Sequence, residues 1–294
     1  MALLIDPPLW PAHGTVFSHL VSDASLAELH AFAAAAGIPE RAFDGDHYDV
    51  PLSRYQDLIA AGALPVDGRT LVRRLVASGL RIPARERNKA VVLALTHRWD
   101  ALLPECTELR QELLERWGEE HRRYHNRAHL LAVLEGLDLL CTPEPAPRTV
   151  ALAAWFHDAV YNGVAGQDEE DSAALAEDRL SALVEVVTPH DVAEVARLVR
   201  LTANHHPESS DAAGQLLCDA DLAVLARHPA AYERYATAVR HEYPHVSDAD
   251  FAKGRAAVVR QLLALEPLFH TQRARELWLD DARRNLSNEL ATLA

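Results

Sequence analysis

The stretch Thr149-Val-Ala-Leu-Ala-Ala-Trp-Phe-His157-Asp158-Ala-Val-Tyr161 joins a long apolar run to two adjacent ionisable residues. Before His157 every face of the predicted helix is apolar, so we expect this helix to be buried. Asn162-Gly163 predicts the helix end and places His157 and Asp158 in the last turn, where the helix dipole favours a cation. A buried carboxylate without a partner is strongly unfavourable or becomes neutral. A divalent metal ion removes that difficulty, because it binds deprotonated Asp and neutral His.

An isolated His-Asp pair is more often a simple hydrogen-bonded pair in a core, so other segments must decide between the two interpretations. On a helix predicted for residues 126–140, His129 lies on the apolar face. Another helix begins at Thr188, and His205 continues its apolar stripe. A third segment is apolar except for two Asp residues, of which Asp221 shares a face with Leu and Val side chains. Together these segments favour a metal site assembled from separate helices.

Several short sequence motifs surround these residues. They are Arg123-Tyr-His-Asn-Arg-Ala-His129, Trp155-Phe-His-Asp-Ala-Val-Tyr161, Asp168-Glu-Glu-Asp-Ser-Ala173, Thr202-Ala-Asn-His205, Asp219-Ala-Asp-Leu222, Arg240-His-Glu-Tyr243 and Gly254-Arg255. These motifs and their order resemble the bacterial group of predicted metal-dependent phosphohydrolases in the HD superfamily, over residues 90–293. The resemblance implies an all-α HD helical bundle with the metal ligands His129, His157, Asp158 and Asp221. The sequence alone leaves open whether Asp219 or Asp221 is the last ligand. One departure is Asp168, where this group is expected to have Asn.

Two imidazoles and two carboxylates leave about two positions on an octahedral divalent ion. One position can hold a water and the other a phosphoryl oxygen, so the expected reaction is attack of a metal-activated water on a nucleotide or another small phosphorylated metabolite. Mn²⁺, Fe²⁺, Co²⁺ and Mg²⁺ all suit these ligands, and the sequence does not choose among them. Besides Asp158, we expect His205 or Asp219 to position the water or protonate the leaving group.

Basic residues near the motifs are candidates for binding the phosphate of a substrate. They are Arg122, Arg123, His125, Arg127, Arg240 and Arg255. Arginine can bind phosphate through two parallel hydrogen bonds. For each arginine taken alone, an ordinary surface salt bridge is the competing interpretation.

Two other functions stay open at this stage. A di-iron oxygenase of the HD type needs further histidines between the His-Asp pair and the last Asp, and His190, His205 and His206 are available. A sensor would use the helical bundle only to bind a nucleotide. The number of bound metal ions and the redox spectra of bound iron would separate the oxygenase from the hydrolase.

Composition limits the classes of partner. The chain has 294 residues, of which 29 are basic and 43 acidic, so its formal net charge is -14. A surface of this sign repels polyanions, which argues against nucleic acid as a partner. The three cysteines form no C-x-x-C pair, and no apolar run reaches the length of a membrane span. We therefore expect a soluble cytoplasmic protein with a small-molecule substrate, whose oligomeric state the sequence does not indicate.

The chain changes character near residues 81–89, a basic segment that contains proline. We expect a small α/β domain over residues 1–86 and a mainly helical domain over residues 90–293. In the first domain, a strand is predicted at residues 2–5 and a helix from Asp23 or Ser25 to Gly37. A second strand is predicted at residues 41–43, before a turn at Asp44-Gly45, and a second helix at residues 71–77.

Three motifs of the first domain resemble a small bacterial domain family of unknown function. They are Leu4-Ile-Asp-Pro-Pro-Leu-Trp-Pro-Ala-His-Gly14, Ser18-His-Leu-Val-Ser-Asp23 and Phe43-Asp-Gly-Asp-His-Tyr-Asp49. The likeness covers residues 2–86 and implies no activity. Loops and strand ends of this domain are rich in His and Asp, at positions His13, His19, His47, Asp6, Asp23, Asp44 and Asp46. Such residues are typical of binding sites, although Asp also stabilises turns without any ligand.

Overall fold

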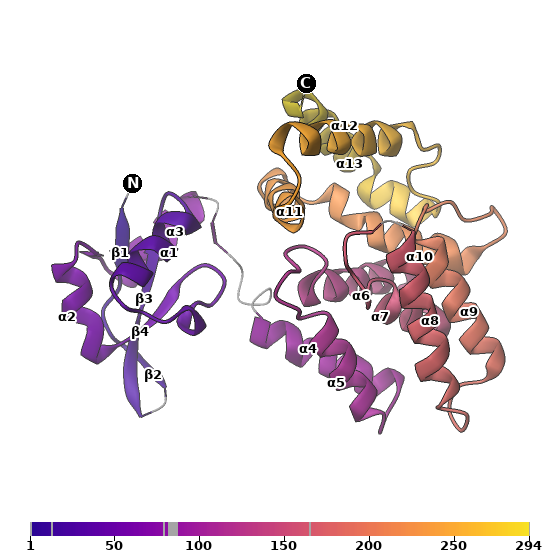
Figure 1. The fold of residues 1–294 in the computed structure, drawn as a ribbon, viewed down its shortest axis with the longest axis horizontal. Coiled ribbons are helices and arrows are strands. Elements are labelled where there is room, and N and C mark those ends of the chain that lie inside the picture. The colour runs from indigo at the N-terminus through magenta and orange to yellow at the C-terminus, as the bar shows by residue number, and fades with distance from the viewer. Residues whose placement is uncertain (1, 13, 79, 82–87, 165, 294) are drawn as a thin grey trace. The chain divides into compact units, whose positions relative to one another are not determined.

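The computed structural model describes residues 2–12, 14–78, 80–81, 88–164 and 166–293 (Figure 1). The chain divides into two compact units, Met1–Ala90 and Val91–Ala294. The first contains all the described strands, and the second is built from helices, so the predicted fold class is confirmed. Most of the basic segment at residues 81–89 lies outside the described residues, as does His13.

A small sheet forms the centre of the N-terminal unit. Its strands are β1 (Leu3–Ile5), β2 (Trp10–Ala12), β3 (Thr15–Ser22), β4 (Tyr48–Pro51) and β5 (Leu64–Pro65). The long strand β3 pairs antiparallel with β1, β2 and β4, while β1 pairs in parallel with β5. Along β4, Tyr48 and Val50 point into the apolar core, so the residues between and before them point to the opposite face.

The helices of this unit are α1 (Leu26–Ala35), α2 (Leu52–Ala60), α3 (Gly68–Ala77) and the short 3₁₀ helix η1 (Glu40–Ala42). Ser25 caps α1 by accepting the N–H of Glu28, and Gly37 follows the helix with a φ of 70°, as the sequence predicts. The strand predicted at residues 41–43 is wrong, because η1 includes Arg41 and Ala42, and Phe43 forms only an isolated bridge with Tyr48, where the strand begins. The alternation of apolar and polar residues that a half-buried strand needs starts only there.

The helical unit contains long helices joined by short loops (Figure 1). They are α4 (Asn88–Leu102), α5 (Thr107–Arg116), α6 (Arg127–Cys141), α7 (Arg148–Phe156), α8 (Gln167–Ser181), α9 (Pro189–Leu201), α10 (Ala212–Leu222), the 3₁₀ helix η3 (Ala223–Ala226), α11 (Pro229–Glu242), α12 (Asp248–Ala264) and α13 (Gln272–Leu293). Asn126 and Thr188 cap α6 and α9 as predicted. The described chain includes no helix with the length and apolarity to cross a bilayer.

The end of α7 differs from the sequence prediction. The helix stops at Phe156, and His157 is its C-cap residue rather than part of its last turn. The chain then turns through Asp158 and reaches Gly163, which has a φ of 79°. A helix that continued to Asn162 would carry Asp158 past its present position. The early end of α7 instead lets His157 and Asp158 point to the same side of the chain.

Fully buried indole rings lie beneath this turn. Trp99 on α4 meets Trp155 on α7 edge-on, with ring centroids 4.9 Å apart. Trp117, which follows α5, donates from Nε1 to the carbonyl oxygen of Trp155 at 2.9 Å. Its ring centroid also lies 5.3 Å from that of His157. The tryptophans therefore join three helices and form an apolar floor under the imidazole.

A glycine allows α6 and α10 to approach each other closely. A Cβ atom added at Gly136 would lie 3.4 Å from both Cα and Cβ of Ala220. Any larger side chain at position 136 would push the two helices apart. This close approach brings His129 on α6 toward Asp221 on α10, so the spacing of the two helices is part of the site.

Glu242, in the last turn of α11, holds the segment that precedes α6. Its Oε1 accepts the backbone N–H groups of Arg123, Tyr124 and His125 at 2.7–2.9 Å. Its Oε2 accepts from His125 Nδ1 at 2.7 Å and from the Tyr161 hydroxyl at 3.1 Å. Burial alone would raise the pKa of Glu242, but the hydrogen bonds, led by that from His125, lower it to about 2. The ionised carboxylate therefore joins α11 to the start of α6.

Replacing Glu242 with Gln tests this carboxylate as a stabilising group. Lowering a carboxyl pKa from 4.5 to about 2 stabilises the folded state by roughly 3 kcal/mol at neutral pH. That contribution is complete above the unfolded pKa and disappears as the pH falls toward 2. We expect the Glu242→Gln variant to lose roughly 2–3 kcal/mol at pH 7 in urea unfolding followed by tryptophan fluorescence, and the difference from wild type to narrow below about pH 4.5.

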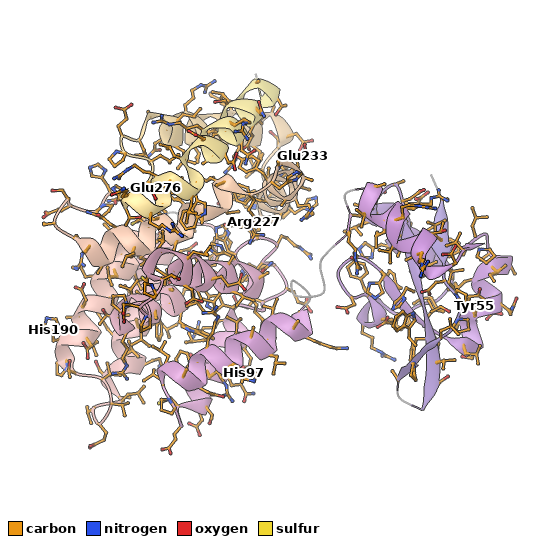
Figure 2. All side chains as sticks on the ribbon, turned by 180° about the vertical axis from the view of Figure 1, so that it is seen from behind. Tyr55, His97, His190, Arg227, Glu233 and Glu276 are labelled. Carbon is orange, nitrogen blue, oxygen red and sulfur yellow. The ribbon has the colours of Figure 1, made fainter. Side chains whose placement is uncertain are left out.

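Glu233 provides the matched control, because it is exposed on the same helix (Figure 2). The Glu233→Gln variant should unfold with wild-type stability at every pH. A loss in Glu242→Gln that stays the same between pH 7 and pH 4 would show that shape, and not the ionised carboxylate, stabilises the contact.

Candidate metal centre

The residues expected as metal ligands converge from separate helices. His129 comes from α6, His157 and Asp158 from the turn after α7, and Asp221 from α10. The Nε2 atoms of the two imidazoles lie 3.2 Å apart. Asp221 Oδ1 lies 3.1 Å from His129 Nε2 and 3.6 Å from His157 Nε2. Asp158 Oδ2 lies 3.7 Å and 3.3 Å from the same two nitrogens.

These separations fit one metal ion among the side chains. Nitrogen and oxygen ligands bind divalent ions at about 2.0–2.2 Å, so neighbouring ligand atoms lie about 3–3.5 Å from each other. His157 Nδ1 is 2.8 Å from the carbonyl oxygen of Ala154 and donates to it, so the neutral ring has its lone pair on Nε2. That lone pair points toward His129 and both carboxylates. The donor set therefore suits a divalent cation.

The electrostatics also favour a positive charge at this point. Burial lowers the pKa of His157, but the carboxylates of Asp158 and Asp221 outweigh it and raise that pKa to about 9. Burial raises the pKa of each carboxyl, yet His157 reverses the effect and both pKa values fall well below the usual range. For His129 burial prevails, and its pKa is lowered. A proton on His157 or a metal ion can supply the positive charge that the two carboxylates require.

Buried polar groups hold the turn that carries Asp158. Arg122 donates to the carbonyl oxygens of Asp158 and the next residue at 2.6 and 3.1 Å. Asp168 Oδ2 accepts the backbone N–H groups of Asn162 and Val164 at 2.9 and 2.8 Å. The oxygen of an Asn side chain could accept the same two bonds. The departure from Asn at position 168 therefore leaves the support of the turn intact.

His205 reaches the site, whereas Asp219 does not. His205 Nε2 lies 2.8 Å from the outer oxygen of Asp221, and the residue has a φ of 52°, which is uncommon for a side-chain-bearing residue. Both oxygens of Asp219 accept backbone N–H groups, those of His270 and Thr271, at 2.7 Å. The Asp219 carboxylate therefore holds the chain at the start of α13, and the catalytic role expected for it stays a prediction.

Two expected substrate-binding residues lie beside the centre. His125 donates to Glu242, its ring stacks on Tyr161 with centroids 4.2 Å apart, and its centroid is 5.8 Å from that of His129. Burial lowers the pKa of His125, but the hydrogen bond to Glu242 outweighs it and the pKa is raised. Arg127 is different, because its Nε donates to the carbonyl oxygen of Leu114 at 2.7 Å. Arg127 therefore joins α6 to α5, and its Nε is not available to bind the phosphate of a substrate.

The remaining expected arginines separate into one exposed and two paired residues. Arg123 is exposed. Arg240 pairs with Asp248 at 2.6 Å and also donates to backbone oxygens. Arg255 is 9% exposed and forms a forked pair with Glu289 at 2.7 and 3.0 Å. These guanidinium groups join helices of the bundle, and the substrate-binding roles expected for Arg240 and Arg255 stay predictions.

The sequence interpretation missed Arg227. A cavity of about 210 Å³ adjoins the ligands and is lined by His129, Ala132, Val133, Glu135, Gly136, Leu139, Ala220, Asp221, Ala223, Val224, Ala226, Arg227 and Trp278. Arg227 follows η3, and Figure 2 labels it on the helical unit. Unlike Arg240 and Arg255, it forms no ion pair with another described residue. No sequence motif identifies Arg227, because only the tight turn of η3 in the folded chain brings this residue back toward α6.

Comparison with known proteins covers the N-terminal unit alone. Residues 3–78 are similar to a protein family of unknown function, DUF4031. No curated protein and no solved structure matches the chain. The N-terminal likeness to a family without known function, expected from the sequence, is therefore found, and it brings no activity with it.

Proposed function

We propose that the helical unit is a metal-dependent phosphohydrolase that acts on a nucleotide or another small phosphorylated metabolite. The observation that carries the proposal is the meeting of two imidazole nitrogens and two carboxylates at 3.1–3.7 Å, beside a cavity lined by an arginine. Few functions other than metal binding explain such a set of buried ionisable groups on separate apolar helices.

His129, His157, Asp158 and Asp221 would hold the ion. When bound, a divalent ion lowers the pKa of a water molecule and polarises a phosphoryl group. The cavity lined by Arg227 also borders His129 and Asp221, and the Arg227 guanidinium can donate to phosphate oxygens. Its volume of about 210 Å³ has room for a small group.

His125 and His205 support this chemistry in different ways. The hydrogen bond to Glu242 outweighs burial and raises the pKa of His125, which favours the protonated ring, and such a ring can donate to a phosphate or leaving-group oxygen. His205 binds the outer oxygen of Asp221 and so orients the inner oxygen toward the imidazoles.

One observation favours a second candidate, the di-iron oxygenase. Asp221 contacts His129 through Oδ1 and His205 through Oδ2, as a carboxylate that bridges two ions would. The other two histidines expected for such a centre do not support it, because both are exposed. Figure 2 labels His190 at the outer edge of the helical unit, well apart from Arg227. The hydrolase remains the better-supported proposal.

Removal of the metal provides the first test. A ligand that binds only the native state at 100 times its Kd stabilises that state by about 2.7 kcal/mol. Chelator should lower the melting temperature of the helical unit in the wild type, and elemental analysis should show one ion lost in the Asp158→Asn variant. The Asp138→Asn variant is the control, because Asp138 is exposed and pairs with Arg98. Equal chelator responses in wild type and Asp158→Asn would count against the metal centre.

Arg227 provides the second test. A charge-assisted hydrogen bond contributes about 1.5–3 kcal/mol, so Arg227→Ala should lower kcat/KM for phosphate release roughly 10- to 100-fold, mainly through KM. Phosphate release from a panel of nucleotides and sugar phosphates would be measured without oxygen, with Mn²⁺ or Co²⁺. Arg260→Ala, an exposed position on α12, should leave the kinetics unchanged. A protein inert to the panel that binds two irons and consumes oxygen would favour the oxygenase.

A further inference from the structure

A second group of metal-competent side chains lies in the N-terminal unit. His19 is on β3, and Asp49 is its directly opposed partner on β4. His47 precedes β4 and lies two residues from Asp49, so both side chains leave the strand on the same face. One ligand atom from each of the three residues lies within 4.8 Å of the others. The alternation that buries Tyr48 and Val50 therefore brings His47 and Asp49 together on the opposite side.

Each histidine is held at one nitrogen by a buried carboxylate. His19 Nδ1 is 3.0 Å from Asp6 Oδ2, and His47 Nδ1 is 2.7 Å from Asp46 Oδ1. An ionised carboxylate only accepts hydrogen bonds, so both Nδ1 atoms carry protons. The Nε2 atoms then face Asp49 Oδ1, at 4.0 Å from His19 and 3.3 Å from His47.

Further contacts fix these carboxylates. Asp6 is 3% exposed and also accepts the backbone N–H of His19 at 2.5 Å and Trp10 Nε1 at 3.3 Å. Asp46 is fully buried and pairs with Arg81 at 3.0 Å. Metal-binding histidines characteristically donate their second ring nitrogen to a carboxylate in this way, which fixes the ring and makes Nε2 a better ligand. Turn formation alone does not explain two such pairs aimed at one carboxylate.

The third side chain is open to solvent. The Asp49 side chain is 40% exposed, while those of His19 and His47 are 24% and 3% exposed. Among the described residues three protein ligands come together, the number typical of sites that bind water or substrate at the metal, whereas structural zinc sites use four protein ligands.

We propose that His19, His47 and Asp49 form a second metal site, which binds a divalent transition metal ion such as Zn²⁺ and leaves at least one coordination position open. Asp6 and Asp46 are positioning residues that orient the imidazoles. This site is separate from the function proposed for the helical unit. All five residues lie within the segment similar to DUF4031, so the site gives that segment a chemical role.

The test uses the full chain, with the helical centre removed by the double substitution His157→Gln/Asp158→Asn. After chelation and dialysis, this protein would be titrated with Co²⁺, whose visible absorption reports nitrogen and oxygen ligands, and then with Zn²⁺ as competitor. We expect one Co²⁺ per chain, displaced by Zn²⁺. Adding His19→Gln or His47→Gln should abolish binding, and adding Asp6→Asn should weaken it about 10- to 100-fold.

His30→Gln is the matched control, because His30 lies in the same unit but contacts Tyr48 rather than the three ligands. It should bind Co²⁺ like the parent protein. Circular dichroism would check that each variant folds. If a histidine variant does not fold, Co²⁺ binding by the Asp49→Asn variant, which is changed at a half-exposed position, tests the site instead. No Co²⁺ bound by the double-substituted protein, or binding unchanged by both His19→Gln and Asp49→Asn, would overturn the proposal. Either result leaves the metal loss expected for Asp158→Asn, and hence the helical centre, untouched.

Discussion

Two carboxylates buried beside apolar helices constrain the whole helical unit. Asp158 and Asp221 are only 15% and 13% exposed, and like charges in one apolar site require a positive charge between them. His129 and His157 lie where that charge is needed, with their Nε2 atoms 3.2 Å apart. A proton can occupy the site, as the raised pKa of His157 indicates, but a divalent ion satisfies all four side chains at once.

Buried hydrogen bonds outside the ligand set keep these groups in place. Glu242 holds the segment before α6, and Arg122 holds the turn after α7. The same physical device appears in the N-terminal unit, where Asp6 and Asp46 each fix one imidazole. The two groups of side chains differ in exposure, because Asp158 and Asp221 are 15% and 13% exposed, whereas Asp49 is 40% exposed.

Much of the secondary structure follows from local chemistry. Capping residues such as Asn126 and Thr188, and the apolar periodicity behind them, determine where α6 and α9 begin. The errors occurred where local signals compete. Asn162-Gly163 resembles a helix end, but α7 stops at Phe156 because tertiary hydrogen bonds to the following turn replace helical ones. Residues 41–43 are apolar enough for a strand but lack the alternation that packs Tyr48 and Val50 into the core.

The sequence by itself determined which side chains are metal-competent and buried, because an ionisable residue on an apolar helix face must have a partner. It could not decide which of two nearby Asp residues faces that partner. Only the folded chain shows that Asp219 accepts the backbone N–H groups of His270 and Thr271, just before α13, while Asp221 meets the imidazoles. The roles of the arginines could not be predicted from the sequence either, since Arg255 and Arg227 differ only in the groups that the folded chain brings beside them. Such contacts join residues far apart in sequence, so their geometry exists only once the helices have packed.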